Sequence, residues 1–267
     1  MVSSQLFPDK PTSPASAIEP IDSARENSLA IQRVALLYQA MPAALVAGLG
    51  CAIALVFVNW NVLPHEQLLA WLAYHLLLSI GRYGLARAFT VASPTAATIR
   101  RWDRAFLTGT LLAGLGWGGT ALVLFPESSP SHQVFLAFVL GGVSAGASST
   151  LAARFDAFLS FAVPTLAPLI LRFFLLNHEQ ALPMAICTLL FSLLMVYTAY
   201  RTSNSVVETL QLKYHNAQLV DQLASQLEDG EQTALLLNVH SEHYRFIMEY
   251  AQDIIYRTDR SGRFTFI

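Results

Sequence analysis

The stretch AFLTGTLLAGLGWGGTALVLF, residues 105–125, contains no charged side chain. A helix needs roughly 20 predominantly apolar residues to cross the hydrocarbon core of a bilayer. Five more apolar runs of similar length lie on either side of it, at residues 34–60, 67–86, 132–153, 155–176 and 181–200. A soluble all-α core is the alternative, but consecutive runs of this length favour an all-α integral membrane protein with six transmembrane helices.

The composition of the 267-residue chain supports the same class. Hydrophobic residues make up 54% of the chain and charged residues 13%, whereas soluble domains average about 45–50% and about 25%. The formal net charge is −2, and no basic stripe of the kind that binds nucleic acid is present. We therefore expect the lipid bilayer as a partner and no nucleic acid.

Lys and Arg are concentrated in alternate connections between the runs. They lie before the first run, after the second, between the fourth and fifth, and after the sixth: Lys10, Arg25, Arg33, Arg87, Arg100, Arg101, Arg104, Arg154, Arg201 and Lys213. The connections at 61–66, 126–132 and 177–180 contain neither residue type. Since cytoplasmic loops carry the excess of positive charge, we expect both termini to be cytoplasmic. Arg172 is the exception, and its long stem can reach the interface.

Residues 1–30 are rich in Ser, Pro and Ala, with acidic residues where a signal peptide requires a basic region before an apolar core. We expect a disordered cytosolic tail that the mature protein retains. Residues 31–200 then form the six-helix transmembrane domain. Cys51 and Cys187 both fall in apolar runs, where a thiol usually packs as a small hydrophobic group.

Small residues four apart mark one face on each of two runs. Gly114 with Gly118, and Gly142 with Gly146, form two G-x-x-x-G patterns. Such residues let two helix backbones approach closely, so that van der Waals contact holds the helices together in lipid. The spacing favours packing between the third and fourth spans within one subunit. A dimer face or a sliding surface for signal transfer is the alternative.

His75 and Arg82 are candidate signal-input residues in the second run. His75 lies in WLAYHLLL, well inside the span, and Arg82 lies near the cytoplasmic end of the same span. An ionisable group at membrane depth is costly and is a hypothesis of function by default. For His75 the alternatives are a neutral imidazole hydrogen-bonded to a helix neighbour, or contact with a ligand or cofactor.

The three short turns that lack Lys and Arg each carry one His and one Glu. Their histidines are His65, His132 and His178. If the turns converge, these side chains can form a shallow site for a divalent metal or titrate together near neutral pH. Polar residues are also ordinary at turns. Because the turns are too short to hold a ligand-binding domain, we expect the signal to be a small solute, a lipophilic ligand or a property of the bilayer.

No motif in the sequence indicates catalysis. The chain has no Gly-rich phosphate loop, no zinc-ligand spacing, no Ser/His/Asp candidate in a plausible context and no carboxylate pair within a run. We expect no catalytic residue and no metal site, and the sequence names no cofactor. The lack of charge pairs within the runs also argues against a proton-coupled transporter.

Residues 201–240 are polar overall, yet their apolar residues keep a helical period. Leu212, Leu219 and Leu223 fit alternating d and a positions of a heptad, and Asn216 falls at an a position. A buried Asn at such a position favours a two-stranded coil in one register. We expect a cytosolic signalling helix that continues the sixth span and forms a parallel homodimer. A lone amphipathic helix has a similar pattern.

The final segment, residues 241–267, reads SEHYRFIMEYAQDIIYRTDRSGRFTFI. A short helical pattern leads to an expected strand at 253–257, a turn at 258–262 and a second strand at 263–267. This order, with DIIYRTD, a D-x-x-G turn and RFTFI, resembles the opening of a PAS domain. A complete PAS domain has roughly a hundred residues, so the resemblance implies the truncated start of an α/β domain in a fragment of a longer protein.

Residues 30–230 resemble the MASE-type multi-helix sensor regions of bacterial signalling proteins. VALLYQAMPAAL, RRWDRAF, the Gly-rich third span and LQLKYHNAQLVDQL carry this resemblance. It implies a membrane sensor that passes a membrane or small-ligand signal through a dimeric helix to a PAS domain and an output domain. The resemblance implies a histidine kinase of a two-component system as the preferred output. A cyclic-di-GMP enzyme, either a diguanylate cyclase or a phosphodiesterase, is the alternative, and a small transporter or membrane scaffold is a third hypothesis.

Overall fold

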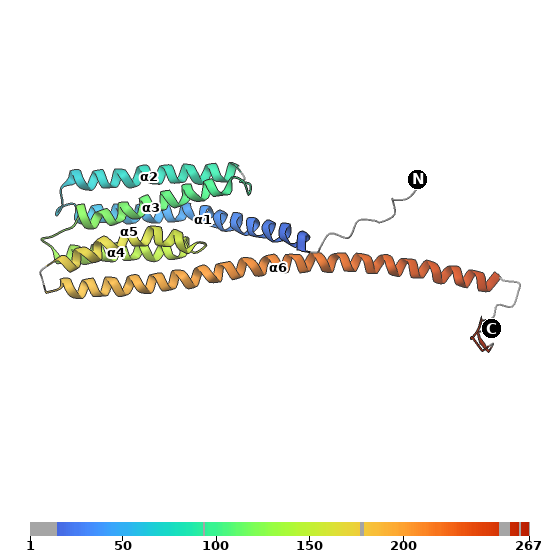
Figure 1. Ribbon diagram of the computed structural model, residues 1–267. Coiled ribbons are helices and arrows are strands. Elements are labelled where there is room, and N and C mark those ends of the chain that lie inside the picture. The colour runs from blue at the N-terminus through green and yellow to red at the C-terminus, as the bar shows by residue number, and fades with distance from the viewer. Residues whose placement is uncertain (1–14, 93, 177–178, 251–256, 262, 267) are drawn as a thin grey trace, which may run out of the picture. The chain divides into compact units, whose positions relative to one another are not determined.

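The structure is a computed structural model that describes residues 15–92, 94–176, 179–250, 257–261 and 263–266. Within these residues it has six helices and one two-stranded sheet (Figure 1). The helices are α1 Ala15–Asn59, α2 His65–Ala92, α3 Ile99–Val123, α4 Pro130–Thr150, α5 Phe155–Leu175 and α6 Ala181–Tyr250. The strands are β1 Arg257–Thr258 and β2 Phe264–Phe266. The chain divides into two compact units, Met1–Leu210 and Gln211–Ile267.

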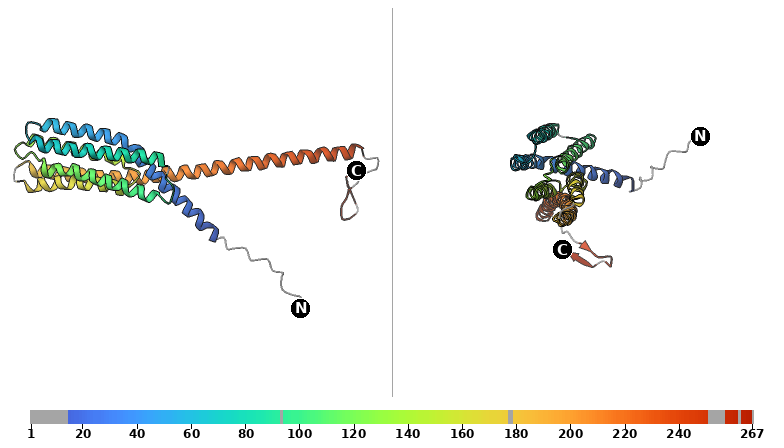
Figure 2. Two further views of the ribbon diagram at one scale, coloured as in Figure 1. Left: turned by 90° about the horizontal axis from the view of Figure 1, so that it is seen from above. Right: turned by 90° about the vertical axis from the view of Figure 1, so that its left-hand side faces the viewer.

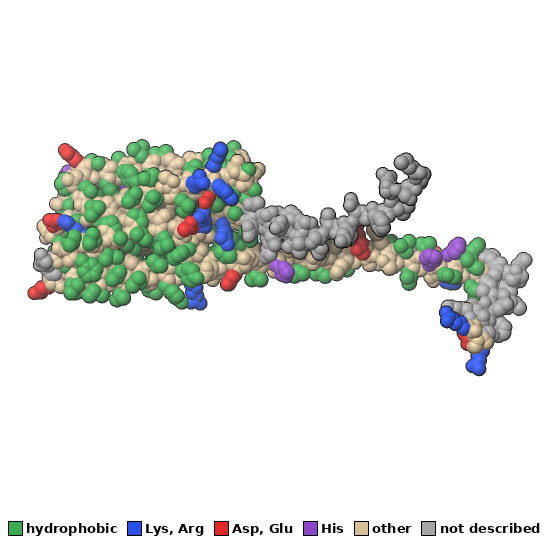
Figure 3. Space-filling view, in the orientation of Figure 1, with side chains coloured by type: hydrophobic (Ala, Val, Ile, Leu, Met, Phe, Trp, Pro, Cys, Tyr) green, Lys and Arg blue, Asp and Glu red, His purple; other side chains and the backbone are tan. Residues whose placement is uncertain are grey.

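All six described helices are long and apolar enough to cross a membrane. Each predicted run overlaps one of them, so the prediction of six membrane spans is confirmed at the level of length and composition. Large apolar side chains cover the outside of the first unit, and Phe57, Leu77 and Phe138 are exposed by 81%, 70% and 77% (Figure 3). Such surface is unfavourable in water but suits a hydrocarbon solvent. The chain is therefore a multi-pass membrane protein.

The start of α1 differs from the sequence-based expectation. Residues 1–30 were expected to form a disordered tail, whereas α1 begins at Ala15. The Ala, Glu and Arg residues between 15 and 30 have favourable helix propensities, and this local preference extends the first span backward. Residues 1–14 lie outside the described part of the chain.

The first unit is a bundle in which the helices run side by side, as the end-on view in Figure 2 shows. The central helix α3 packs against α1, α2 and α5, and α4 packs against α1 and α5. Phe106, Phe158 and Phe173 are among the largest fully buried side chains. Phe106 belongs to α3 and the other two to α5, and all three rings are part of one hydrophobic core.

The backbones of α3 and α5 approach each other closely at the first G-x-x-x-G pattern. A Cβ atom added to Gly118 would lie 1.8 Å from the carbonyl oxygen of Pro164, and one added to Gly114 would lie 2.5 Å from that of Phe161. The hydroxyl of Thr165 donates to the Gly114 carbonyl at 3.3 Å. The expected pairing of these glycines with the fourth span is therefore wrong. Sequence spacing identifies a small-residue face, but helices adjacent in sequence need not be neighbours on that face.

The second G-x-x-x-G pattern has a different environment. A Cβ atom added to Gly142 or Gly146 would meet nothing within 4 Å. These two glycines of α4 do not bring another helix into contact, so the expectation that they pack tightly is also wrong. They instead leave space beside α4, and this space belongs to the cavity described below.

The membrane part of α6 packs against α4 and α5. The ring of Phe191 lies beside Gly141, 3.4 Å from where a Cβ atom of that glycine would be. Tyr200 meets Phe155 of α5 edge to face, with ring centroids 5.5 Å apart. Ala185 and Ala199 are buried on the same helix. Beyond Tyr200, α6 continues as a helix to Tyr250 without a break.

The second unit contains the last part of α6 and the hairpin of β1 and β2. The strands are antiparallel and pair Arg257 with Phe266 and Thr258 with Phe264. Residues 253–256 of the first expected strand lie outside the described residues, and Thr258, expected in the turn, is in β1. This hairpin is the only sheet among the described residues, so they contain no PAS fold.

The turn between β1 and β2 is held by the carboxylate of Asp259. Its Oδ1 accepts hydrogen bonds from the Ser261 hydroxyl at 2.6 Å and from the backbone N–H groups of Ser261 and Arg263, both at 2.9 Å. The Ser261 hydroxyl and the Arg263 N–H favour the charged form and lower the pKa of Asp259. The Asp at the start of the D-x-x-G pattern therefore organises the turn.

This turn should lose its hydrogen bonds only under strongly acidic conditions. Because the pKa of Asp259 is lowered in the folded turn, the contribution of its carboxylate to the stability of the turn is complete above the ordinary aspartate pKa. The contribution is lost as the pH falls through the lowered value. We expect the amide ¹⁵N–H signals of Ser261 and Arg263 to stay shifted through mildly acidic pH and then to move together. In Asp259→Asn, which keeps an acceptor oxygen, this transition should disappear; its persistence would contradict the assignment.

Candidate ligand cavity in the membrane bundle

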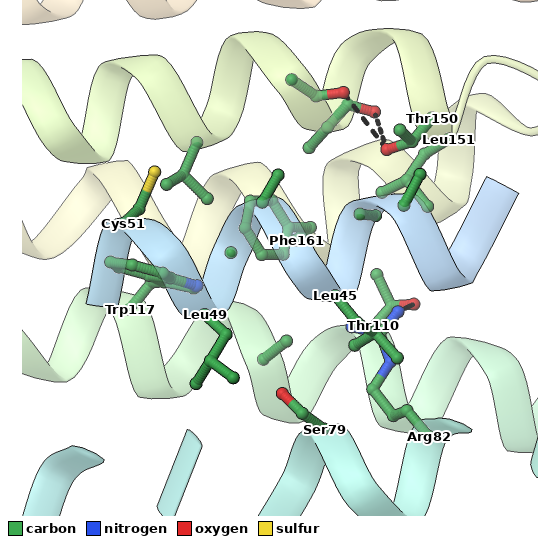
Figure 4. Close-up of a pocket in the computed structure, with 18 of the residues that line it drawn as sticks. Leu45, Leu49, Cys51, Ser79, Arg82, Thr110, Trp117, Thr150, Leu151 and Phe161 are labelled. Carbon is green, nitrogen blue, oxygen red and sulfur yellow. Dashed lines mark hydrogen bonds between the residues drawn. The ribbon is translucent and has the colours of Figure 1, made fainter. Parts of the chain in front are cut away.

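A cavity of about 360 Å³ lies within the bundle and is lined by residues of α1, α2, α3, α4 and α5 (Figure 4). This volume is within the range of small-molecule binding sites. Its walls are mostly apolar, and its polar groups are few. The lining residues labelled in Figure 4 are Leu45, Leu49, Cys51, Ser79, Arg82, Thr110, Trp117, Thr150, Leu151 and Phe161.

Small residues on α1 and α4 create this space. Gly48, Gly142 and Gly146 line the cavity, and a Cβ atom added to any of them would meet nothing within 4 Å. Gly142 and Gly146 are also exposed at the surface of the bundle, as is Ala47 of α1. The cavity therefore opens between α1 and α4, on a surface that the membrane-spanning parts of both helices share.

Arg82 of α2 forms part of the cavity wall, and its side chain extends toward α3. Its Nη2 donates to the hydroxyl of Thr110 at 3.4 Å, and its guanidinium lies 5.9 Å from the ring centroid of Phe106. Its Nε is buried and has no hydrogen-bond partner in the part of the chain that the structure describes. Among the described residues no carboxylate forms an ion pair with Arg82. The wall of the cavity thus carries a positive charge that no described carboxylate neutralises.

His75 lines the same cavity, and an aromatic cluster surrounds its ring. The ring centroids of Trp71 and Trp117 lie 4.2 Å and 5.0 Å from that of His75. Its Nδ1 lies 3.1 Å from the carbonyl oxygen of Trp71, which can only accept, so Nδ1 carries a proton. In a neutral ring Nε2 is then an acceptor, and it is buried without a partner among the described residues.

The aromatic side chains of α2 also fix the contact of α2 with α3. Trp71 Nε1 donates to the Gly116 carbonyl, and the hydroxyl of Tyr74 donates to the Leu112 carbonyl, both at 2.8 Å. A Cβ atom added to Gly116 would lie 2.4 Å from the ring of Tyr74. Gly116 is therefore the residue that lets α2 bring His75 against α3.

The two candidates from the second run therefore belong to one site. His75 and Arg82 are seven residues apart, which is about two turns and roughly 10 Å along one face of a helix. Both line the same cavity. The hydrogen bond to Trp71 agrees with the first alternative for His75, whereas its contact with a ligand or cofactor stays a prediction.

Two of the three turn histidines are held within their own turns. His65 stacks on Trp60 with ring centroids 4.2 Å apart and bonds its carbonyl oxygen through Nε2 at 2.9 Å. His132 Nδ1 lies 2.6 Å from the Ser129 hydroxyl. His178 lies outside the described residues. No group of three or more His, Cys, Asp or Glu that could hold a metal occurs in the described part of the chain.

Charged residues that the sequence reasoning missed connect α3 to α5. Arg154, just before α5, contacts the carboxylates of Asp103 and Asp156. Burial opposes the charge of Arg154, but hydrogen bonds to Asp156 and Asp103 outweigh burial and raise its pKa. Arg172, expected to reach the interface alone, contacts Glu127 from the α3–α4 connection. The pairing of Asp103 in RRWDRAF with a distant arginine has no local sequence signal.

Asp103→Asn should destabilise the bundle by about 1–2 kcal/mol. The side chains of Arg154 and Asp103 are 23% and 22% exposed, so this ion pair is intermediate between exposed and buried pairs. Exposed ion pairs contribute up to about 1 kcal/mol, and breaking a buried pair costs about 3–5 kcal/mol. Asp156 is 57% exposed, so Asp156→Asn should cost less. Unfolding of the detergent-solubilised protein by a denaturing detergent measures both changes. Equal losses for the two variants would contradict this ranking.

No protein-family model, curated protein or solved structure matches the chain. The fold and the cavity therefore define its class by themselves. It is a multi-pass α-helical membrane protein whose bundle contains a mostly apolar cavity, lined by His75 and Arg82 together with a few hydroxyl side chains.

Proposed function

We propose that the chain is the membrane-embedded sensory input region of a bacterial signalling protein. The observation that carries this proposal is the continuity of α6. This helix spans the bilayer after Ala181 and continues far beyond the length that a span needs, to Tyr250. A continuous helix connects a membrane bundle mechanically to whatever follows it. A transporter would have no evident use for such an extension.

The proposed orientation has both termini in the cytoplasm of a bacterial inner membrane. Lys and Arg side chains gather toward one end of the bundle in Figure 3, where the α2–α3 and α4–α5 connections lie. By the positive-inside rule this end is cytoplasmic. The part of α6 beyond Tyr200 then lies in water on the cytoplasmic side.

The proposed assembly is a parallel homodimer through this part of α6. Leu212, Leu219 and Leu223 are exposed by 62%, 43% and 59% on the single chain. Three leucines at heptad spacing are costly to leave in water, and a second copy of the helix would bury them. Asn216 lies exposed between them, at a position where two copies can hydrogen-bond across the seam.

Signal transfer is proposed to run from the cavity through α4 and α5 to α6. Gly142 of α4 lines the cavity, and the preceding residue, Gly141, lies beside the ring of Phe191 of α6. A ligand that fills the space beside Gly142 would therefore act one residue away from the α4–α6 contact. A switch of this kind needs two packings with different affinities for the signal.

The proposed downstream partners are a PAS domain and an output domain. The support is the order of helix, strand, D-x-x-G turn and second strand along the chain. The histidine kinase remains slightly preferred as the output, with a diguanylate cyclase or phosphodiesterase as the alternative.

Cysteine cross-linking in native membranes tests both the assembly and the transfer. In a Cys51→Ser, Cys187→Ser background, Leu219→Cys should form a disulfide between two copies, whereas Asp221→Cys, two positions away on the outer face of the heptad, should not. Adding Gly142→Leu should change the cross-linking rate at position 219 several-fold. Equal cross-linking at 219 and 221 would refute the dimer, and an unchanged rate with Gly142→Leu would refute the transfer.

A further inference from the structure

We propose that the cavity binds an amphiphilic anion, with its acidic head group on Arg82 and its apolar chain along the wall toward Trp117. Binding of this ligand class is independent of signalling, whereas its role as the sensed signal rests on the proposed function.

The charge of Arg82 calls for an anionic partner. An unpaired cation is costly at membrane depth and is normally paired. Thr110 supplies only a long, neutral hydrogen bond at 3.4 Å, and no described residue bonds the buried Nε. A planar guanidinium binds carboxylate and phosphate oxygens through paired N–H groups. The hydroxyl of Ser79, one turn before Arg82 on α2, lines the same part of the cavity.

The rest of the cavity suits an apolar chain. In Figure 4, Leu45, Leu49 and Phe161 lie between Arg82 at one end and Trp117 and Cys51 at the other. The opening between α1 and α4 is rimmed by small residues and faces the surface that lipid would cover. A ligand dissolved in the bilayer can therefore enter sideways, without passing through water.

His75 adds a second point of recognition. Its Nε2 is a buried acceptor without a partner among the described residues, roughly 10 Å along α2 from Arg82. A hydroxyl group on the ligand, placed at that distance from the acidic head, would donate to it. The preferred ligand is thus an acid with a hydroxyl near the far end of its chain.

The head group can come from a free carboxylic acid or from the phosphate of a membrane lipid. Both offer the same anionic oxygens to Arg82. The two sources differ in whether an added anionic phospholipid competes for the site, and the experiment separates them on this basis.

The probe is ω-bromododecanoate, because bromine quenches tryptophan fluorescence on contact and Trp117 lies at the far end of the cavity. The full chain is held in phosphate-free maltoside micelles at alkaline pH, and the uncharged ω-bromododecanol serves as the matched probe. We expect the carboxylate to bind at least tenfold more tightly than the alcohol. Arg82→Gln should remove this difference and leave alcohol binding unchanged, and Arg82→Lys should retain part of it.

Gly142→Leu provides a second variant that tests the location of the site. Its side chain enters open space, so the bundle should fold and both probes should lose quenching. Gly119→Leu on α3 also enters open space but lies outside the cavity, and its binding should match the wild type. Helicity measured by circular dichroism controls for folding in each variant.

Two competition measurements define the ligand further. Displacement of the probe by phosphatidic acid, lost in Arg82→Gln, would assign the head group to a lipid phosphate, and no displacement would assign it to a free carboxylic acid. An ω-hydroxy acid should compete several-fold better than the unsubstituted acid, and His75→Phe should abolish this advantage.

The proposal is overturned if Arg82→Gln binds the carboxylate as tightly as the wild type does, or if Gly142→Leu leaves quenching intact. The absence of any hydroxyl advantage would overturn the part that concerns His75. Because none of these measurements involves α6 beyond Tyr200, binding can succeed where the cross-linking test of the proposed function fails.

Discussion

Gly118→Val should prevent the bundle from reaching its folded packing. The first added carbon would lie 1.8 Å from the carbonyl oxygen of Pro164, which belongs to a backbone and cannot move aside as a flexible side chain can. Overpacking of a core commonly costs about 1–3 kcal/mol, and a backbone clash of this depth should cost at least about 3 kcal/mol. Such a loss is a large fraction of the stability of a typical domain. The expected result is loss of the monodisperse protein on size-exclusion chromatography in detergent.

Gly119→Val is the matched control for this prediction. Gly119 is the next residue of α3, and an added Cβ atom there meets nothing within 4 Å. Its variant should elute and unfold like the wild type, because both substitutions have the same helix propensity cost. If the two variants behaved alike, α3 and α5 would not be in the close contact that Gly118 and Pro164 define.

The contrast between the two G-x-x-x-G patterns shows what could be predicted from the sequence. Hydropathy alone predicts the six spans, because a bilayer requires long apolar helices. The spacing of Gly114 and Gly118 correctly indicates a face of close contact, but its partner is α5. The same spacing at Gly142 and Gly146 indicates no close contact at all. A small residue permits both an approach and a void, and only the positions of the other helices decide between them.

The candidate site, too, could be predicted from the sequence only in part. His75 and Arg82 could be singled out because an ionisable residue within a span is rare and costly. Their common cavity could not be predicted, because its walls come from five helices that are distant in sequence. The contact of Arg154 with Asp103 was missed for a related reason, since each residue alone is an ordinary charge at a helix end.

The leucine seam proposed for α6 leads to the second large effect. Leu219→Asp combined with Leu223→Asp should convert the dimer to a monomer. Burying one leucine contributes about 1.5–3 kcal/mol, and the two substitutions remove four leucines from a symmetric seam. The loss is therefore about 6 kcal/mol or more, which weakens dimerisation by a factor of at least about 10⁴. Charge repulsion between the new carboxylates acts in the same direction. Sedimentation in density-matched detergent measures the monomer–dimer equilibrium directly.

A control with the same added charge separates the seam from a general electrostatic effect. Gln218→Asp combined with Ser225→Asp places two carboxylates at c positions of the same heptads, on the outer face of the helix. This variant should remain a dimer, with a dissociation constant within a few-fold of the wild type. If it dissociates as readily as the Leu219 and Leu223 variant, net charge and not the leucine face governs assembly. If neither variant changes the mass of the particle, α6 does not hold the copies together, and the exposed leucines must be covered in another way.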